Sequence, residues 1–507
     1  MYEADTILKL LDLGSADDPA LSAPARAPLN YRGLRSIVEQ TGSALNFIGI
    51  GAGTRVAIVL PNGPEAASAF LAIASAATAA PLNPAYREPE FAFYLSDLNA
   101  KALVILEGMD SAARQVAATR QIPIIELVPE SAKGAGEFSL RMPRTPSRAG
   151  AARTTPDDVA LVLHTSGTTS RPKMVPLTHR NVAASAINVR TTLQLTRSDV
   201  CLNIMPLFHI HGLIGALLSS VSAGALVSCA PAFDALQFFR WFAETGPTWY
   251  SAVPTMHQAI LARAARNKDI VERSRLRLIR SSSSSLPPMV MEELERTFHV
   301  PVLEAYGMTE AAHQMASNPL PPRARLAGSV GVAAGPELAI MNEAGDLLPA
   351  TEIGEVVIRG RNVTSGYVNN AEANAKAWSH GWFRTGDQGY LDTSGYLRLT
   401  GRLKEMINRG GEKIGPLEID NALLEHPAVA QAVTFAMPHP MLGEEVAAAV
   451  VLRDGAVSSE SELREFVAAR LAQFKVPRRV LIRDAIPKGP TGKVQRLGLA
   501  KVLGLES

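Results

Sequence analysis

The chain has 507 residues, and at about 150 residues per domain that length predicts about three compact units. Its 50 Lys and Arg residues almost balance 48 Asp and Glu residues, so the net charge of +2 argues against a uniformly basic nucleic-acid-binding protein. With 47% hydrophobic and 19% charged residues, the composition excludes a mainly disordered chain and predicts a large folded interior.

The N-terminal segment, residues 1–14, mixes acidic residues with leucines and has no basic start of a secretory signal. The longest apolar stretches, 66–81 and 213–233, are rich in Ala, Ser and Gly, which makes them too weakly hydrophobic to cross a membrane. Two cysteines, Cys201 and Cys229, cannot build a disulfide framework or a cysteine-rich metal site in a chain this long. We therefore expect a cytoplasmic protein without a membrane span, in which both apolar stretches form buried helices and strands.

Short runs rich in Val, Ile and Leu recur between longer Ala-rich segments over the first three hundred or so residues. Such runs are typical of buried strands, and their alternation with helices predicts an α/β fold with largely parallel sheets. The predicted strands cover residues 56–60, 102–106, 159–163, 248–253, 276–280 and 302–305. Residues 143–158, rich in Pro, Arg, Ala and Thr, predict an exposed connection.

The pattern changes after residue 333 to alternating strands and tight turns, at 355–359 and 389–399. A further mixed α/β unit starts near residue 401, with a predicted helix at 416–424 and a predicted strand at 447–452. Charge is uneven here, because residues 470–501 hold nine basic residues and one acid, a net +8. This basic stretch is either a solvated surface or a lid that contacts polyphosphate.

A dense cluster of hydroxyl side chains follows the predicted strand at 159–163, where the sequence reads HTSGTTSRPK from His164 to Lys173. Backbone N–H groups and hydroxyls of such a loop can bind phosphate oxygens, and its lysine adds positive charge. No Gly-Lys-Ser/Thr ends the loop, so it is not a Walker A motif, and an exposed polar turn is the alternative. The candidate phosphate-binding residues are Thr165, Ser166, Gly167, Thr168, Thr169 and Lys173.

Three further motifs carry groups suited to a nucleotide. The sequence YGMTE, from Tyr306 to Glu310, follows a predicted strand; its tyrosine can stack on a base and its glutamate can hold Mg²⁺. Asp387 and Arg402 are a carboxylate and a guanidinium able to grip a ribose diol, although each is more often part of a turn or a surface ion pair. Lys493 ends a Gly/Pro-rich loop inside the basic stretch and can neutralise charge on a phosphorus centre.

These motifs, in this order, resemble the adenylate-forming superfamily of acyl-CoA synthetases, luciferase-like enzymes and adenylation domains. The resemblance implies an α/β fold with a large N-terminal domain, residues 1–402, that has parallel-rich sheets and a small β-barrel-like subdomain. It also implies a small, mobile α+β C-terminal domain, residues 403–507, hinged at Lys404. Members join a carboxylate to AMP from ATP with loss of pyrophosphate, then rotate the small domain and transfer the acyl group to a thiol.

The resemblance also implies a role for individual residues, with ATP, Mg²⁺ and coenzyme A as cofactors. Lys493 matches the lysine of the adenylation step and Glu310 the magnesium ligand, with Thr165 and Lys173 in the phosphate loop. The nucleotide contacts fall on Ser283 and Ser284, which replace small apolar residues at the adenine edge, and on Tyr306, Gly307, Met308, Thr309, Asp387 and Arg402. Arg409, Gly410 and Gly411 match the segment that lines the thiol tunnel after rotation, where absent side chains let pantetheine approach the backbone.

The acid pocket is expected around His209, His211, Ser283 and His313. Amino-acid-activating members carry an aspartate for the substrate ammonium in the region where this chain reads PLFHIHG, so free coenzyme A is the expected acceptor. Polar groups in the pocket favour a small acid with a second polar end, because burying such groups without partners costs about 1–3 kcal/mol each. The stretches 165–176, 206–212, 280–286, 313–321 and 408–415 resemble the oxalate-CoA ligase branch.

Several alternatives stay open at this point. Hydrogen-bonded core histidines are the alternative explanation of His211 and His313. A medium-chain or aromatic acyl-CoA ligase is the nearest other enzyme, and a nucleotide-binding scaffold without activity is a further one. Binding of the basic stretch to nucleic acid is disfavoured, because Phe474 is its only aromatic residue. We expect a monomer or homodimer.

Overall fold

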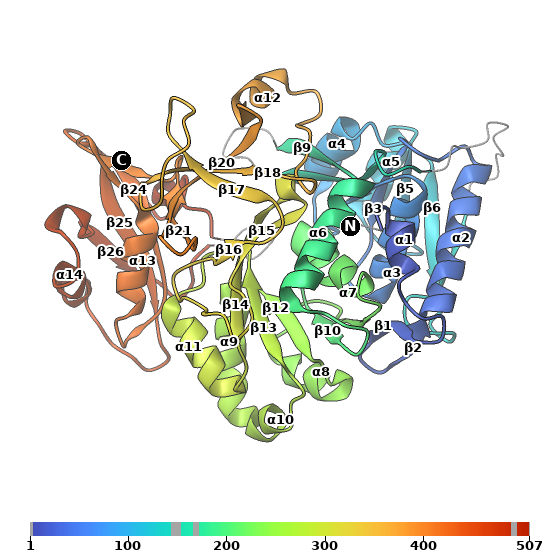
Figure 1. The fold of residues 1–507 in the computed structure, drawn as a ribbon, viewed down its shortest axis with the longest axis horizontal. Helices are drawn as coiled ribbons and strands as arrows, with labels where there is room; N and C mark the ends of the chain where they lie inside the picture. The colour runs from blue at the N-terminus through green and yellow to red at the C-terminus, as the bar shows by residue number, and fades with distance from the viewer. Residues whose placement is uncertain (1–3, 143–153, 166–171, 488–493, 506–507) are drawn as a thin grey trace.

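The computed structural model describes residues 4–142, 154–165, 172–487 and 494–505. Two large sheets with helices between and outside them form most of the molecule, and a C-terminal unit packs at one end, at the left of Figure 1. Among the described residues, every helix is too short or too polar to cross a bilayer.

The N-terminal sheet has seven strands in the order β7-β6-β5-β3-β4-β8-β9. Its central strands are parallel, as the run of Val, Ile and Leu residues predicts for strands buried on both faces. β8 and β9 pair in antiparallel fashion, so the two ends of the loop from Thr165 to Lys173 are neighbours. The strands are β3 (Arg55–Val59), β4 (Thr78–Pro81), β5 (Ala102–Leu106), β6 (Ile124–Pro129), β7 (Phe138–Arg141), β8 (Val159–Thr165) and β9 (Lys173–Thr178).

The second sheet has nine strands in the order β16-β15-β14-β13-β12-β10-β11-β1-β2. The run from β14 to β1 is parallel, so the carboxyl ends of β12, β13 and β14 meet along one edge of the sheet. The strands are β1 (Pro19–Ala23), β2 (Arg26–Asn30), β10 (Val200–Asn203), β11 (Leu226–Cys229), β12 (Trp249–Ala252), β13 (Leu278–Ser282), β14 (Val302–Met308), β15 (His313–Ser317) and β16 (Val332–Ala333).

Alternating side chains of these strands pack into different helix layers, because successive residues of a strand point to opposite faces. On β3, Val56 and Ile58 pack toward the helices between the sheets, whereas Ala57 and Val59 pack against the outer helices. The inner layer holds α1 (Ile7–Leu11), α2 (Tyr31–Phe47), α3 (Pro64–Ala76), α6 (His179–Leu193), the π-helix η1 (His211–Leu218) and α7 (Ser219–Val221). The outer helices are α4 (Glu88–Asp97) and α5 (Ala112–Thr119) on one side, and α8 (Phe238–Thr245), α9 (Pro254–Ala264), η2 (Ala265–Asn267), α10 (Lys268–Glu272) and α11 (Pro288–Phe298) on the other.

A five-stranded antiparallel sheet forms the small β-rich unit, which has the half-barrel character expected from the sequence. Its hairpin from β20 to β21 places Asp387 directly opposite Arg402. The elements are β17 (Glu337–Met341), β18 (Gly354–Arg359), α12 (Ala371–Ala377), β19 (Trp378–Ser379), β20 (Trp382–Leu391) and β21 (Leu397–Arg402), and the short 3-10 helix η3 (Thr309–Ala311) leads from β14 toward β15.

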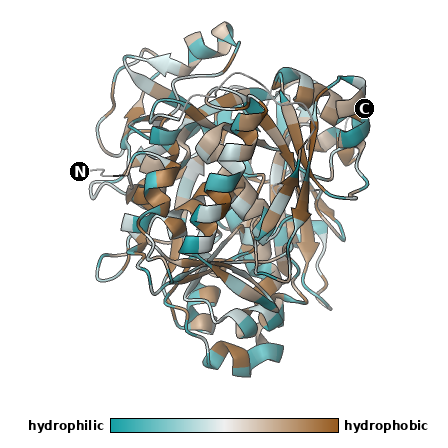
Figure 2. Ribbon diagram, turned by 90° about the vertical axis from the view of Figure 1, so that its right-hand side faces the viewer, coloured by the Kyte–Doolittle hydropathy of each residue, from teal (hydrophilic) through white to brown (hydrophobic). Residues whose placement is uncertain are grey.

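The C-terminal unit is a five-stranded sheet with helices on both faces. Brown, hydrophobic strands run through the interior of the molecule and teal residues lie mostly outside in Figure 2. Lys404 lies in the turn between β21 and this unit. The elements are β22 (Ile407–Arg409), β23 (Glu412–Ile414), α13 (Pro416–Leu424), β24 (Val429–His439), β25 (Gly443–Leu452), α14 (Glu460–Ala468), η4 (Gln473–Lys475), β26 (Arg479–Ile482) and α15 (Leu499–Val502).

The predicted α/β fold class is confirmed. The predicted strands at 56–60, 102–106, 159–163, 248–253, 276–280 and 355–359 each lie within two residues of an observed strand, whereas β14 continues three residues beyond the predicted 302–305. The predicted strands and turn at 389–399 are the end of β20, a turn and the start of β21, and 447–452 is part of the longer β25. The predicted helix at 416–424 coincides with α13, which begins at Pro416 because proline needs no N–H partner in a first helical turn. The apolar stretch at 213–233 is buried or half-buried as far as residue 230, but part of it forms the π-helix η1, which the apolar pattern does not distinguish from an α-helix. Most of the predicted exposed connection at 143–158 lies outside the described residues.

Candidate active site

Polar side chains from four segments meet at the carboxyl ends of β12, β13 and β14. Ser251 lies on β12, Arg280 on β13, Ser283 just after β13, and His313 starts β15, while His211 starts η1. The carboxyl edge of parallel strands is where α/β proteins usually bind ligands. The structure therefore brings together His211, Ser283 and His313, three of the four residues expected to bind the acid.

The two histidines stack on each other, with ring centroids 5.0 Å apart. His211 Nε2 lies 2.6 Å from Ser251 Oγ, and its Nδ1 lies 3.0 Å from Ser283 Oγ. Arg280 Nη1 lies 3.0 Å from His313 Nε2. Because a guanidinium can only donate, this contact makes Nε2 the acceptor and leaves the imidazole proton of His313 on Nδ1.

Arg280 is the least expected member of this cluster, because it is a cation with 0% exposure. Its Nη2 donates to Gln314 Oε1 at 3.2 Å, and its Nε has no hydrogen-bond partner in the described parts of the chain. Burial lowers the pKa of Arg280 to about 9, and no described carboxylate lies within ion-pair distance. A buried guanidinium without a counter-charge is costly, which indicates that an anion completes the site.

Backbone conformation at this edge is unusual. Ser283, Ala312 and His313 have φ angles of 76°, 49° and 112°. Such residues cost about 1–3 kcal/mol each and cluster at functional sites. Gly307 makes the turn at His313 possible, because a Cβ at residue 307 would lie 1.8 Å from the His313 carbonyl oxygen. Only glycine fits at residue 307.

A second group joins β14 to the half-barrel sheet. The Tyr306 hydroxyl donates to Asp387 Oδ2, and Arg402 Nε lies 3.3 Å from Asp387 Oδ1. Thr385 Oγ1 accepts from the backbone N–H of Asp387 at 3.1 Å, which fixes the backbone of β20 at this residue. Burial, and secondly the charge of Asp387, raise the pKa of Tyr306. The structure thus assembles the three residues expected to hold adenine and ribose, and their individual roles stay predictions.

The third group surrounds Glu310, which follows β14 in η3. Its Oε1 accepts from the Tyr367 hydroxyl at 2.9 Å, and Lys173 Nζ lies 4.5 Å from the centre of the Tyr367 ring. Burial raises the pKa of Glu310 and lowers that of Lys173, and the charge of Lys404 also lowers the Lys173 pKa.

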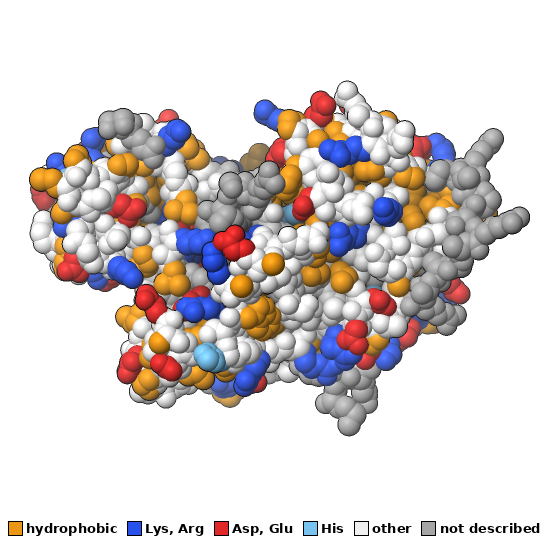
Figure 3. Space-filling view, turned by 90° about the horizontal axis from the view of Figure 1, so that it is seen from above, with side chains coloured by type: hydrophobic (Ala, Val, Ile, Leu, Met, Phe, Trp, Pro, Cys, Tyr) orange, Lys and Arg blue, Asp and Glu red, His pale blue; other side chains and the backbone are white. Residues whose placement is uncertain are grey.

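No group of three or more His, Cys, Asp or Glu side chains gathers as a metal site in the described ranges. Glu310 alone fits Mg²⁺, which is usually held by one or two carboxylates together with phosphate oxygens and water. Seen from above, basic side chains border the hollow between the C-terminal unit at the left and the rest of the molecule (Figure 3).

The remaining predicted residues divide into three sets. Thr165 and Lys173 are paired across β8 and β9, while Ser166, Gly167, Thr168, Thr169 and Lys493 lie outside the described residues. Ser284 is exposed and His209 is half-buried beside His211, whose backbone N–H donates to His209 Nδ1 at 3.3 Å.

The glycine-rich segment from Arg409 to Gly411 forms the β22–β23 turn. Its bonds run to the C-terminal sheet, with Arg409 Nε 2.6 Å from Glu445 Oε1 and the Gly410 N–H donating to Leu442 O at 2.9 Å. Both glycines have positive φ angles, 56° and 99°. Glycine adopts such angles without steric cost, which explains its presence in this turn.

Comparison with known proteins identifies the family. The AMP-binding enzyme family matches residues 14–368, and the AMP-binding enzyme C-terminal domain matches residues 418–493. This chain belongs to the AMP-binding enzyme family. It is 45% identical to an oxalate-CoA ligase of Arabidopsis thaliana over 505 residues, which cover 97% of this chain and 98% of that protein. It is also 43% identical to an oxalate-CoA ligase of Saccharomyces cerevisiae, over 89% of this chain and 87% of that protein.

Among solved structures, the ATP-bound MatB protein of Rhodopseudomonas palustris superimposes with a TM-score of 0.88 and 28% identity, covering 98% of this chain and 99% of that one. The match confirms the fold over nearly the whole AMP-binding enzyme.

Three residues of this AMP-binding enzyme were missed by sequence reasoning: Arg280, Gln314 and Tyr367. Arg280 ends a run of apolar strand residues and precedes five serines, so it reads as the polar end of a strand. Gln314 bonds to Arg280 and Tyr367 bonds to Glu310, both far away in sequence, and neither contact can be inferred from the residues next to them in the chain. An arginine in a predicted buried strand is the one signal that was present.

Gly215 on η1 packs against both histidines and provides a first test of the site. A Cβ at residue 215 would lie 2.5 Å from His313 Nε2 and 3.2 Å from His211 Cδ2. Gly215→Ala is therefore expected to displace His313 from Arg280 and to lower kcat/KM for the acid about tenfold, since overpacking costs roughly 1–3 kcal/mol. Steady-state kinetics would check this, with Gly42→Ala as the control, because the nearest atom to a Cβ at Gly42 is 3.5 Å away. An unchanged KM for the acid would contradict the packing argument.

Proposed function

We propose that this AMP-binding enzyme is an ATP-dependent oxalate-CoA ligase. The observation that carries the proposal is the buried Arg280, which has no described counter-charge and lies beside His211, Ser283 and His313. The 45% identity to an oxalate-CoA ligase over nearly the full length supports the same substrate. In the first step oxalate and ATP give oxalyl-AMP and pyrophosphate, and in the second oxalyl-AMP and coenzyme A give oxalyl-CoA and AMP.

The second carboxylate of the acid supplies the negative charge that Arg280 lacks. Arg280 Nε–H, which has no partner among the described residues, is the donor for that carboxylate, and charge-assisted hydrogen bonds of this kind are about twice as strong as neutral ones. Ser283 and His211 hold the reacting carboxylate toward the end of β14. A monocarboxylic acid would leave Arg280 buried without a counter-charge, at a cost of several kcal/mol. The site therefore selects a small dianion over an aliphatic or aromatic monoacid.

Adenylation then needs in-line attack of a carboxylate oxygen on the α-phosphorus, with the electrons of the broken P–O bond leaving on pyrophosphate. Lys173 and Lys493, together with the N–H groups and hydroxyls of the loop from Thr165, spread the charge that develops on the phosphoryl oxygens. Mg²⁺ held by Glu310 would supply further positive charge to the phosphates. Tyr306, Asp387 and Arg402 would hold the adenosine in place.

Thioester formation follows a rotation of residues 403–507 about Lys404. This movement would withdraw Lys493 and bring Gly410 and Gly411 to the acyl-adenylate. The thiolate of coenzyme A attacks the acyl carbon, and AMP leaves with the electrons of the broken acyl–oxygen bond. The position of Lys404 between the half-barrel sheet and the C-terminal sheet supports its assignment as the hinge.

A panel of acids with ATP, Mg²⁺ and coenzyme A tests the proposed function. Pyrophosphate release would be measured with oxalate, hexanoate and benzoate, and the thioester product identified by mass spectrometry. We expect kcat/KM for oxalate to exceed the values for both monoacids by at least about a hundredfold, the size of effect that an unpaired buried charge produces. Activity with hexanoate or benzoate and none with oxalate would instead identify a medium-chain or aromatic acyl-CoA ligase. Absence of pyrophosphate release with every acid would favour a nucleotide-binding scaffold.

A further inference from the structure

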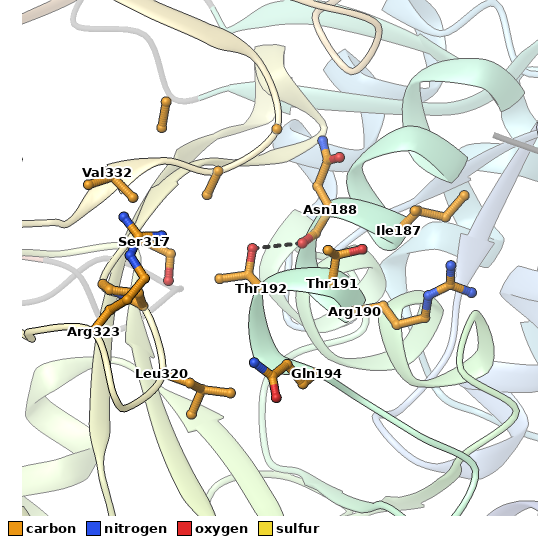
Figure 4. A pocket seen from close by; sticks show the side chains of 14 residues that line it. Ile187, Asn188, Arg190, Thr191, Thr192, Gln194, Ser317, Leu320, Arg323 and Val332 are labelled. Atoms are coloured by element: carbon orange, nitrogen blue, oxygen red, sulfur yellow. Dashed lines mark hydrogen bonds between the residues drawn. The ribbon is translucent and has the colours of Figure 1, made fainter. Parts of the chain in front are cut away.

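A cavity of about 590 Å³, called the outer cavity below, lies between α6 and the segment that contains β15 and β16. Figure 4 shows side chains of α6, among them Thr191 and Thr192, facing Ser317, Leu320 and Arg323 across it. The lining residues are both polar and apolar, and they include none of the four residues expected to bind the acid. The cavity is thus separate from the acid site.

Gln314 lies between Arg280 and the outer cavity, and its side chain forms hydrogen bonds on both sides. On the inner side, its Oε1 accepts from Arg280 Nη2 at 3.2 Å. On the outer side, its Nε2 donates to Thr192 Oγ1 at 3.0 Å and to the Ala334 carbonyl oxygen at 3.0 Å, and both of these residues line the outer cavity. Gln314 has 0% exposure, so its amide fills the space between the guanidinium and the cavity.

The amide is itself held firmly on both sides. Thr192 Oγ1, which accepts from Gln314, donates in turn to Asn188 O at 2.8 Å, the bond drawn in Figure 4. The backbone of Gln314 is also held, because its N–H donates to Ser185 Oγ at 3.3 Å and its carbonyl accepts from Asn362 Nδ2 at 2.9 Å. A side chain with every polar atom bonded cannot swing away without breaking several contacts.

We propose that Gln314 is a specificity-determining residue that limits the length of the acid. It acts as a positioning residue, because its amide holds Arg280 close to His313 and closes the end of the acid site toward the outer cavity. The inference rests on the proposed function, in which Arg280 binds the second carboxylate. With Gln314 in place, the two carboxylates must lie next to each other, as in oxalate; without it, Arg280 can move toward the cavity and accept a dicarboxylate with methylene groups between its ends.

Gln314→Ala tests the inference with a series of dicarboxylates: oxalate, malonate, succinate and glutarate. We expect kcat/KM for oxalate to fall at least about tenfold, because Arg280 is no longer positioned, and the ratio of succinate to oxalate to rise at least about a hundredfold. Activity would be followed by pyrophosphate release, and the thioesters identified by mass spectrometry. An unchanged ratio of succinate to oxalate in the folded variant would overturn the inference.

Two further variants keep the test decisive. Gln314→Leu retains most of the side-chain volume but removes the hydrogen bond to Arg280, so kcat/KM for oxalate should fall without any gain for longer acids. An unchanged kcat/KM for oxalate would show that Gln314 does not position Arg280.

Thr191→Trp, at an exposed position that lines the outer cavity, should leave kcat/KM for oxalate unchanged when it is the only substitution. Combined with Gln314→Ala, it should fill the cavity and cancel the gain for succinate. A gain that survives Thr191→Trp would mean that longer acids do not enter this cavity.

Failure of the inference can be told apart from failure of the proposed function. If the wild type does not use oxalate at all, the proposed function is wrong, whatever the variants do. If the wild type uses oxalate and Gln314→Ala keeps the same preference among the four dicarboxylates, the function stands and the role of Gln314 is wrong. Thermal unfolding of each variant would establish that the compared proteins are folded.

Discussion

Arg280→Met is expected to lower kcat/KM for oxalate by about a hundred- to a thousandfold, because truncating one partner of a buried charge pair costs about 2–5 kcal/mol. The same variant should be at least as stable as the wild type when no acid is bound. Arg280 is a fully buried cation without a described carboxylate partner, and burial alone accounts for the lowering of its pKa to about 9. Replacing such a charge with an apolar side chain of similar length removes a desolvation cost.

Steady-state kinetics with oxalate and thermal unfolding would be measured on the same preparation of Arg280→Met. The first should show a lower kcat/KM and the second an equal or higher stability than in the wild type. Arg277→Met is the matched control, because Arg277 lies three residues earlier and forms a 2.6 Å ion pair with the buried Asp199. We expect the control to lose stability and to keep the acid preference. If Arg280→Met were strongly destabilised and its preference among acids unchanged, Arg280 would be a structural residue and the assignment of the second carboxylate to it would be wrong.

Lys493→Ala is expected to slow adenylation of oxalate by about a hundred- to a thousandfold, the effect of removing one group that stabilises developing charge in a transition state. Thioester formation from supplied oxalyl-AMP should be nearly unchanged, because the proposed rotation about Lys404 takes Lys493 away from the acyl-adenylate. The lysine ends the loop PKGPTGK within a stretch that carries a net +8.

Measuring the two half-reactions separately distinguishes a catalytic lysine from a general effect of charge. Lys488→Ala removes the same charge from the other end of the loop and should alter both half-reactions only slightly, because the resemblance assigns the adenylation step to Lys493 and not to Lys488. An equal loss of both half-reactions in Lys493→Ala would contradict the division of roles between the two steps. A loss of the same size in Lys488→Ala would assign the effect to the overall charge of the loop.

Much of the fold could be predicted because its strands are buried on both faces. Runs such as 102–106 are continuous in Val, Ile and Leu, and they coincide with β5 of the parallel sheet. Proline and glycine at element ends, as at Gly415 and Pro416, place boundaries well because their backbone preferences are local. The π-helix at His211 was not predictable, because the apolar pattern of residues 211–218 does not distinguish a π-helix from an α-helix.

The candidate site was predictable where a motif is contiguous, or where several motifs in a fixed order resemble one family. Tyr306, Glu310, Asp387 and Arg402 were found this way, and the structure places Tyr306, Asp387 and Arg402 in one group. Arg280 was not found, because what distinguishes it is burial without a carboxylate partner among the described residues. A sequence does not show that a cation is fully buried and without a described carboxylate beside it.

Local patterns in the sequence are therefore sufficient to predict the α/β class, the positions of most strands along the chain and the nucleotide motifs. They also give the charge division behind the overall +2, with a basic stretch near the C-terminus. The proposed selection of the acid by charge and length depends instead on contacts between distant residues, above all Arg280 with His313 and Gln314 with Thr192. The physical reason is that backbone propensity and burial act over a few neighbouring residues, whereas the cost of a buried charge depends on everything that surrounds it.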